Sequence, residues 1–260
     1  MTTKFDAGRA ARFVAEAHAT RADYQNLPEA IAPPTIADAY AAQEALMGMW
    51  TPKFGPVVGL KIATTTKIMQ ALMGIDHPCG GMLYESRVHQ SPARIAKAGF
   101  VNLVVECELA VRLKAGLPHA ATPYTRESVR AAIGHVMPAF ELIEDRRAHY
   151  KSCKAASMIA DNCWNGGVVL GQPVPLDDAR DLDKLAGRLE IDGKPANDGR
   201  TDDPLGALAW VANLAAERGR PMTAGMVVIT GSVIPTLPIE IGSTFRFTLD
   251  GLGTTTMTAT

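Results

Sequence analysis

The clearest pattern of apolar and polar positions runs from Val101 to Leu113, where every second residue is apolar. Strict alternation over this length predicts a β-strand with one face on a core, because successive side chains of a strand point to opposite sides. The other face is more polar and carries Glu106 and Glu108. A second extended run, residues 139–143, carries Glu141. Two neighbouring strands with acidic side chains are therefore expected.

Helical spacing of apolar residues dominates the start of the chain. It predicts one helix over residues 5–19 and a second over residues 36–49, which Thr35 would cap after the break at Pro33-Pro34. A later helix is expected from Pro204 to Arg218, because Asp203 precedes it and Gly219 follows it. Shorter helices are expected at residues 66–73 and 126–133.

Short apolar runs between these helices predict further strands. They cover residues 57–62, 166–170, 189–191, 226–230 and 244–249, with a hairpin turn at Asp192-Gly193 and a loop over residues 76–81. Regular alternation of strand and helix is missing, so an α+β fold is expected. We predict a helical N-terminal region, residues 1–55, and a β-rich catalytic core, residues 56–260, within one structural unit.

Composition narrows the class of protein. The chain has 260 residues, of which 47% are hydrophobic and 20% charged, as in ordinary globular proteins. With a net charge of −1 and no long run of Lys or Arg, nucleic-acid binding is not expected. A polar N-terminus and the lack of a long apolar run argue against a signal peptide and a membrane span, so we expect a cytoplasmic protein. The four cysteines form no C-x-x-C pair, and we expect free thiols.

The two glutamates of the first strand pose an electrostatic problem. Glu106 and Glu108 lie two residues apart, so their side chains share one face, roughly 6.5–7 Å apart along the strand. Two carboxylates this close repel each other unless the face is exposed to water or a cation lies between them. Val104 and Ala110 flank the pair on the same face, and Glu141 follows on the next extended run. These features favour a hard divalent ion such as Mg²⁺, which takes oxygen ligands.

A series of short motifs extends over nearly the whole chain, from about Ile36 to Met257, and their order and spacing together are specific. They are Gly59-Leu60-Lys61-Ile62, Met69-Gln70, Gly74-Ile75-Asp76, Val105-Glu106-Cys107-Glu108, Pro138-Ala139-Phe140-Glu141, Ala160-Asp161-Asn162, Leu170-Gly171, Thr230-Gly231 and Asp250-Gly251-Leu252-Gly253. The series resembles the 2-keto-4-pentenoate hydratase / 4-oxalocrotonate decarboxylase group of the fumarylacetoacetate hydrolase superfamily.

This resemblance implies a fold and a site. The fold would be a mixed β-roll that carries the site, with a smaller helical N-terminal part. Glu106, Glu108 and Glu141 would bind Mg²⁺ or Mn²⁺, which would chelate a 2-oxo acid, and Lys61 would be the active-site lysine. The resemblance also implies a set of positions that contact the substrate: Cys79, Asp161, Asn162, Trp164 and Thr230.

Several functions follow as hypotheses. The leading one is a metal-dependent hydro-lyase that adds water to a 2-hydroxydienoate or 2-keto-enoic acid in aromatic or related catabolism. Alternatives are a decarboxylase of a 2-oxo-dioate such as 4-oxalocrotonate, a C–C hydrolase or tautomerase of acylpyruvate type, and a non-enzymatic 2-oxo-acid-binding protein. By the same resemblance we expect a homo-oligomer and a small-molecule substrate. The charge and the lack of a long apolar run lead us to expect neither nucleic acid nor membrane as partner.

Two positions depart from the family pattern. Cys79 stands where the hydratases carry an acidic residue, and Trp164 stands where they carry a serine. Both changes keep the metal ligands and bear on water addition. Trp164 would also reshape the pocket and favour a flatter or more apolar substrate tail. His77 and Glu85 lie outside the motif in which the C–C hydrolases of the superfamily carry their His/Glu pair, so we interpret them as loop residues. The charged run 144–147 is interpreted as an ion-paired strand end.

Overall fold

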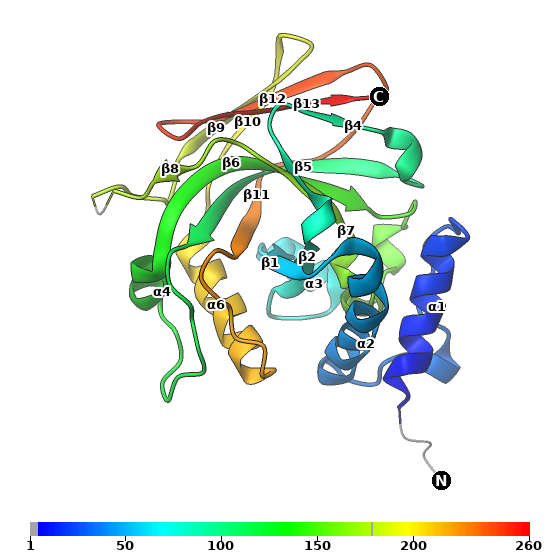
Figure 1. Cartoon of the computed structure of the whole chain (residues 1–260). Helices are drawn as coiled ribbons and strands as arrows, with labels where there is room; N and C mark the ends of the chain where they lie inside the picture. Colours follow the sequence, from blue (N-terminus) through cyan, green and yellow to red (C-terminus); the bar gives the residue numbers. More distant parts are fainter. Residues whose placement is uncertain (1–4, 178) are drawn as a thin grey trace.

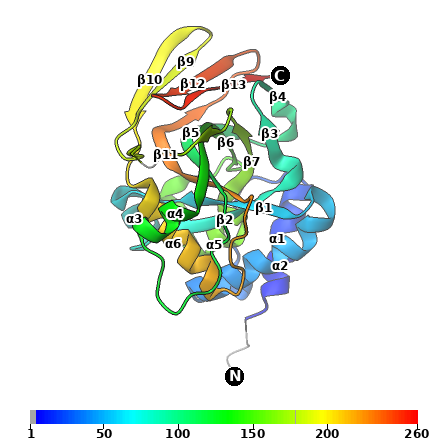
Figure 2. The same cartoon turned by 60° about the vertical axis from the view of Figure 1, so that its left-hand side comes forward.

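Two β-sheets lie one above the other, and most helices gather below the larger sheet (Figure 1, Figure 2). The computed structural model describes residues 5–177 and 179–260. Residues 1–4, part of the polar N-terminus discussed above, lie outside the described residues. This mixed arrangement confirms the α+β class and the β-roll that the sequence indicated.

The larger sheet is mixed and strongly curved, and its strands β5 and β6 arch over the helices (Figure 1). Its order is β2-β1-β11-β5-β6-β7-β3, and β8 pairs with β6. β1 runs parallel to β11 and β3 parallel to β7, while the other pairs are antiparallel. The strands are β1 (Val57–Ala63), β2 (Cys79–Tyr84), β3 (Val88–Gln90), β5 (Leu103–Leu113), β6 (Ile133–Glu144), β7 (Asn165–Leu170), β8 (Val174–Pro175) and β11 (Val227–Pro238).

The smaller sheet covers the convex side of the larger one (Figure 1). Its order is β10-β9-β12-β13-β4, and its pair β13–β4 is parallel. The predicted hairpin forms at Asp192-Gly193, between β9 and β10. The strands are β4 (Ala93–Ile95), β9 (Ala186–Ile191), β10 (Lys194–Arg200), β12 (Thr244–Leu249) and β13 (Gly253–Ala259).

The helices begin at the capping residues that the sequence indicated. Thr35 accepts a hydrogen bond from the Asp38 N–H at the start of α2, and Asp203 accepts one from Gly206 N–H at the start of α6. Short 3₁₀ turns join several elements, including those at residues 85–87, 97–99 and 162–164. No helix within 5–177 and 179–260 is long and apolar enough to span a membrane. The α-helices are α1 (Ala7–Ala19), α2 (Ile36–Phe54), α3 (Lys67–Met73), α4 (Arg126–Ala132), α5 (Ala155–Ala160) and α6 (Pro204–Glu217).

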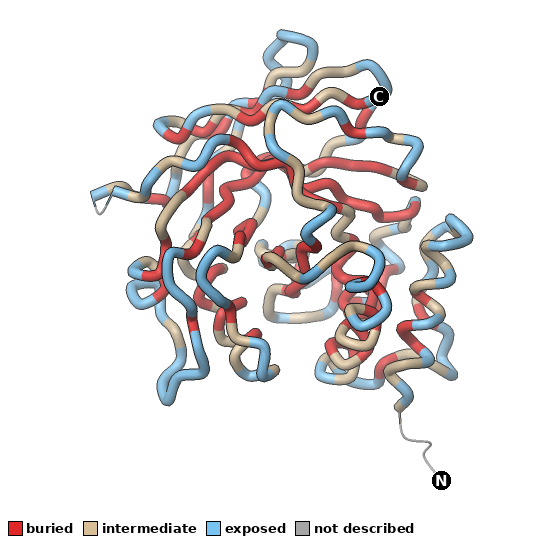
Figure 3. Tube along the Cα trace, in the orientation of Figure 1, coloured by how far each residue is buried: buried red, intermediate tan, exposed pale blue. Residues whose placement is uncertain are grey.

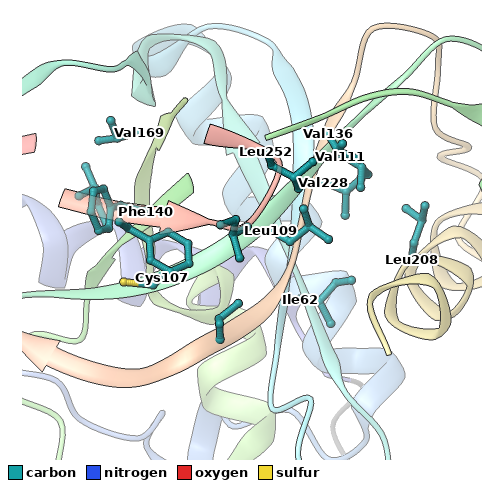
Figure 4. Close-up of a cluster of buried hydrophobic side chains, with 14 of the residues drawn as sticks. Ile62, Cys107, Leu109, Val111, Val136, Phe140, Val169, Leu208, Val228 and Leu252 are labelled. Carbon is teal, nitrogen blue, oxygen red and sulfur yellow. The ribbon is translucent and has the colours of Figure 1, made fainter. Parts of the chain in front are cut away.

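The main hydrophobic core lies between the two sheets and extends to α4 and α6. Figure 4 shows Leu109 and Phe140 within it, and Figure 3 shows buried residues along the strands that meet there. Phe140 packs against Phe247 of the smaller sheet, with ring centroids 6.2 Å apart. The odd-numbered residues from Leu103 to Leu113 all belong to this core, as their alternation predicted. Their opposite face is free to build a site under the sheet.

Some expected elements differ from the observed ones. Residues 76–81 were expected to form a loop. The prediction is wrong for residues 79–81, because β2 begins at Cys79. This strand is buried along its whole length, so it lacks the alternation that marks a half-exposed strand. β11 continues well beyond Thr230 because register shifts carry its pairing past Gly231. The strand β13 and the helix α5 were not predicted.

Candidate metal centre

Three carboxylates converge on the inner face of the larger sheet. Glu106 lies directly opposite Glu141 in the pairing of β5 with β6. Glu108 follows two residues later on the same face and lies beside β11, opposite Ser232. One oxygen of each glutamate lies within 4.8 Å of the others. Glu108 and Glu141 are fully buried, whereas Glu106 is partly exposed. The arrangement could hold a metal ion.

Each carboxylate receives a hydrogen bond from another strand, two of them from β11 and one from β7. The Thr236 hydroxyl donates to Glu106, and the Gly231 N–H donates to Glu108 Oε2 at 2.7 Å. Asn165 Nδ2 donates to Glu141 Oε1 at 2.9 Å. These contacts fix the carboxylates, yet Glu108 Oε1 and Glu141 Oε2 are buried without a hydrogen-bond partner among the described residues. Buried polar atoms are normally satisfied, so both oxygens are available for a ligand.

The electrostatics agree with a missing positive charge. Burial, followed by Glu141 and Glu106, raises the pKa of Glu108 well above its ordinary value. Burial also raises the pKa of Glu141, although Lys61 opposes this shift. A divalent cation would offset both the burial and the mutual repulsion, and an all-carboxylate oxygen set suits a hard ion. The residues present therefore fit the metal that the sequence implied.

Lys61 extends from β1 into the same site. Its Nζ lies 3.0 Å from Glu141 Oε1 and donates to the Cys163 carbonyl at 3.2 Å. Burial is the largest single influence and would lower the pKa of Lys61, but Glu141, Cys163 and Glu106 together outweigh it. The pKa is therefore raised, and the side chain is charged. Gly81 lies opposite Lys61 in the register of β1 with β2, and a Cβ there would come within 2.9 Å of Lys61 Cγ. Glycine at this position leaves room for the lysine.

A left-handed turn before β7 supplies the carbonyl that Lys61 contacts. Asn162, Cys163 and Trp164 have φ angles of 50°, 49° and 58°, which non-glycine residues rarely adopt in succession. Asn162 holds the turn on the edge strand β2: its Oδ1 accepts from the Met82 N–H at 2.7 Å, and its Nδ2 donates to the Met82 carbonyl at 3.0 Å. Strained backbone of this kind persists where its surroundings determine it, often beside functional groups.

Two of the expected substrate contacts, Cys79 and Trp164, lie in one apolar cluster near the carboxylates. Burial raises the pKa of Cys79 to about 11, with Thr64 and Lys61 opposing the shift, so the group is a thiol at neutral pH. The ring of Trp164 stacks on Tyr150 at 5.3 Å and meets Tyr24 edge-on at 5.1 Å. Their contact with a substrate stays a prediction.

The other three expected contacts are buried and engaged elsewhere. Asp161 pairs with Arg146 and, at 2.6 Å, with His18 Nε2. The Thr230 hydroxyl donates to the Leu109 carbonyl at 2.9 Å. Asn162 binds β2 as described above. Their side chains support the site through the backbone and through ion pairs, and a substrate contact for them stays a prediction.

The charged strand end and the candidate His/Glu pair also have clear positions. Arg146 pairs with Asp161 and Arg147 with Asp23, whereas Glu144 accepts hydrogen bonds from main-chain N–H groups. His77 precedes β2 and Glu85 follows it, so the length of the strand separates them by roughly 20 Å. The structure does not bring these two together as a water-activating pair.

Four partners of the site were not predicted from the sequence: Thr236, Gly231, Asn165 and the carbonyl of Cys163. Each lies on a different segment from the glutamate or lysine that it contacts. Local periodicity carries no information on such pairings, because they depend on the register of strands far apart in the chain. Gly231 and Cys163 contribute main-chain atoms, which a sequence pattern does not reveal.

Comparisons with known proteins agree with this geometry. The family model described as "Fumarylacetoacetate (FAA) hydrolase C-terminal" matches residues 75–259. The 2-hydroxyhexa-2,4-dienoate hydratase of Comamonas testosteroni is 31% identical over 226 residues, which is 85% of this chain and 84% of that protein. The 2-keto-4-pentenoate hydratase 1 of Dechloromonas aromatica (strain RCB) is 31% identical over 220 residues, 83% of this chain and 82% of that protein.

A solved structure is similar over nearly the full length. The 4-oxalocrotonate decarboxylase from Pseudomonas putida G7, complexed with magnesium and adipate, has a TM-score of 0.88 and 26% identity. The superposition covers 98% of this chain and 97% of that one. The same enzyme, complexed with calcium and acetate, has a TM-score of 0.88 and 25% identity.

Proposed function

Because this chain belongs to the fumarylacetoacetate hydrolase family, we propose that it is a metal-dependent hydro-lyase that adds water to a 2-hydroxydienoate or 2-keto-enoic acid. Relatives named as hydratases of such acids, at about 30% identity over most of the chain, support the reaction class. The observation that carries the proposal is the carboxylate cluster, in which two buried oxygens have no hydrogen-bond partner in the described part of the chain.

We assign Mg²⁺ or Mn²⁺ to this cluster, with Glu106, Glu108 and Glu141 as ligands. A bound divalent ion would supply Lewis-acid stabilisation for negative charge that develops on a 2-oxo or 2-hydroxy oxygen. The Gly231 N–H, the Thr236 hydroxyl and the Asn165 amide orient the three carboxylates from outside. Such outer partners set ligand geometry in metal sites generally.

We assign proton handling to Lys61. Its charged Nζ is fixed between Glu141 and the Cys163 carbonyl, so it can stabilise a developing oxyanion or give a proton to it. Cys79 is protonated at neutral pH and is not a base. The stacked rings of Trp164 and Tyr150 form an apolar wall near the carboxylates, which suits an unsaturated, uncharged substrate tail.

A second candidate reaction is decarboxylation of a 2-oxo-dioate. The near-complete superposition on 4-oxalocrotonate decarboxylase favours it. Both reactions pass through an enolate of a 2-oxo acid, so the same carboxylate cluster and Lys61 serve either one. The substrate assay below separates the two reactions by their products.

The deciding experiment offers the purified protein 2-hydroxypenta-2,4-dienoate and 4-oxalocrotonate in parallel, each with Mg²⁺. We expect loss of dienol absorbance faster than spontaneous ketonisation, and 4-hydroxy-2-oxopentanoate as the product by NMR. EDTA should abolish the reaction. Release of CO₂ from 4-oxalocrotonate without hydration of the dienoate would support the decarboxylase instead. Tight oxalate binding without turnover of either acid would support the non-enzymatic 2-oxo-acid-binding protein.

The cytoplasmic location, the homo-oligomeric assembly and the boundary between residues 55 and 56 stay predictions. Gel filtration with light scattering would measure the number of copies.

A further inference from the structure

A second cavity lies outside the metal centre. It has a volume of about 310 Å³ and is bounded by α1, the C-terminal end of α2, and the 3₁₀ turns at residues 85–87 and 97–99. Figure 1 shows α1 and α2 side by side at this edge of the molecule. Neither Lys61 nor any of the three glutamates lines the cavity. The cavity is therefore lined by residues other than the three glutamates and Lys61.

Three cations on the cavity wall lack a carboxylate partner. Within 5–177 and 179–260, no carboxylate forms a salt bridge with Arg21, Lys53 or Arg87. Arg21 donates to two main-chain carbonyls, at 3.0 Å and 2.7 Å, which leaves its charge uncompensated. Lys53 and Arg87 lie over the same ring, that of Phe54, at 5.0 Å and 4.4 Å from its centroid. Cations gathered in this way repel each other and attract an anion.

The inner end of the cavity adds a buried donor. Arg146 is only 2% exposed, and its Nε has no hydrogen-bond partner among the described residues. Its guanidinium pairs with Asp161, which His18 also contacts, so this group is already neutralised. Glu144 is the one carboxylate among the described residues that line the cavity. Its oxygens accept main-chain N–H groups at 2.7 Å and 3.0 Å, and its charge also acts on Arg87. One carboxylate faces three cations, so positive charge predominates.

The remaining wall is aromatic. Trp50 meets Phe54 at 5.7 Å and Tyr84 at 5.9 Å between ring centroids, both edge to face, and Phe100 also lines the cavity. Arginine beside aromatic faces is the usual setting for a planar carboxylate, which it binds through two parallel N–H groups. We propose that this cavity is a second ligand site, which binds a small organic anion with one carboxylate and a flat unsaturated or aromatic body.

The two sites share one residue, which determines how the proposal must be tested. Asn165 lines the cavity and also donates to Glu141. Binding to the cavity must therefore be separated from binding to the metal centre. The proposal does not rest on the hydro-lyase function, so the experiment uses no enzymatic assay.

The probe is benzoate, titrated into the full-length protein in EDTA by isothermal titration calorimetry. We expect the double variant Lys53→Gln/Arg87→Gln to bind benzoate at least about tenfold more weakly, because charge-assisted hydrogen bonds are lost. Arg94→Gln removes an exposed arginine on β4, away from the cavity, and should bind benzoate like the parent. Unchanged affinity in the double variant would overturn the proposal.

Further experiments test which class of ligand binds and where in the protein it binds. Acetate, which lacks the flat body, should bind at least about tenfold more weakly than benzoate; equal affinity would overturn the assigned class. The Glu106→Gln variant should keep the parent affinity for benzoate. Loss of benzoate binding in this variant would show that the anion binds at the metal centre instead of the cavity. In crystals soaked with 4-bromobenzoate, anomalous scattering should place bromine inside the cavity, near the rings of Trp50 and Tyr84, because the carboxylate at the opposite end of the ligand faces the arginine. A bromine peak at the glutamates instead would contradict the second site.

Discussion

At the scale of single residues, the main question is how three carboxylates tolerate each other. Two unit charges about 4 Å apart interact by roughly 4 kcal/mol at the effective dielectric typical near a protein surface. Glu106, Glu108 and Glu141 form three such repulsive pairs, and Lys61 makes a direct ion pair with one of them. The site is therefore short of positive charge, which protons supply in the metal-free protein and a divalent ion would supply more fully.

The first prediction concerns Glu106, the proposed metal ligand that is partly exposed. Glu106→Gln keeps the shape and removes the charge, so we expect Mg²⁺-dependent turnover to fall by about 100-fold or more. The stability should change by less than about 1 kcal/mol, because the site is not fully buried there. Calorimetric Mn²⁺ binding, turnover and thermal melts would measure these effects. Glu240→Gln, at an exposed turn, is the matched control, and parent-like Mn²⁺ affinity in Glu106→Gln would contradict the ligand assignment.

The second prediction concerns pH. Because the pKa of Glu108 is raised mainly by burial, the folded metal-free chain keeps a proton that the unfolded chain loses above its ordinary pKa of about 4.3. Stability falls with rising pH wherever the folded state binds more protons. We therefore expect the metal-free protein to lose stability from about pH 5 upward until the raised pKa is passed, and Mg²⁺ to stabilise it more at higher pH.

Thermal melts in EDTA and in Mg²⁺, over a pH series, would measure both trends. Glu108→Gln removes the titrating group and should flatten the dependence of the metal-free protein on pH. If the slope is the same in parent and variant, another group is responsible.

At the scale of elements, the positions of Lys61 and Glu141 depend on the turn at residues 162–164, which lies between α5 and β7. The turn at residues 162–164 aims the Cys163 carbonyl at Lys61 and leads directly into β7, whose first residue, Asn165, contacts Glu141. The same turn is held on β2, the edge strand of the larger sheet, by the side chain of Asn162. One short segment thus positions both the lysine and Glu141, a proposed metal ligand.

The third prediction tests this turn. Asn162→Ala removes two buried hydrogen bonds and places alanine at a positive φ, so we expect the free energy of unfolding to fall by about 2–4 kcal/mol. Asn162→Gly loses the same hydrogen bonds without the positive-φ penalty and should be about 1 kcal/mol less damaging. Urea denaturation would measure both. Equal effects of the two substitutions would show that backbone strain contributes nothing at this position.

At the scale of the whole molecule, the core and the site occupy opposite faces of one curved sheet. The face of β5 with odd-numbered residues packs under the smaller sheet, and the face with Glu106 and Glu108 looks toward the helices. The smaller sheet contributes no carboxylate or lysine to the site. Its role is to bury the convex face and so fix the curvature that brings β5, β6 and β11 together.

The fourth prediction follows from that division. Phe247→Ala, on the smaller sheet, should lower the free energy of unfolding by about 3–5 kcal/mol, because Phe247 is fully buried against Phe140. The folded fraction should still bind Mn²⁺ with the parent affinity. Thr248→Ala, at the neighbouring half-buried position, should cost about 1 kcal/mol or less. A large loss of Mn²⁺ affinity in folded Phe247→Ala would show that the two faces are coupled.

Local patterns in the sequence determined much of the outline. The alternation over residues 103–113 predicted both the strand and the shared face of Glu106 and Glu108, because the side-chain period of a strand is two. Capping residues predicted where α2 and α6 begin, because they satisfy main-chain N–H groups within one turn. Motif order pointed to the family. These features depend on neighbours in the chain, so sequence alone could determine them.

The tertiary structure alone decided which partners complete the site. Three contacts depend on the register and curvature of the sheet. Glu141 lies opposite Glu106, and Gly231 donates its N–H to Glu108. Lys61 reaches the carbonyl of residue 163. A shift of one residue in any pairing would turn these groups to the other face. The physical reason is that long-range pairing is selected by burial of the entire sheet, a quantity that no local pattern contains.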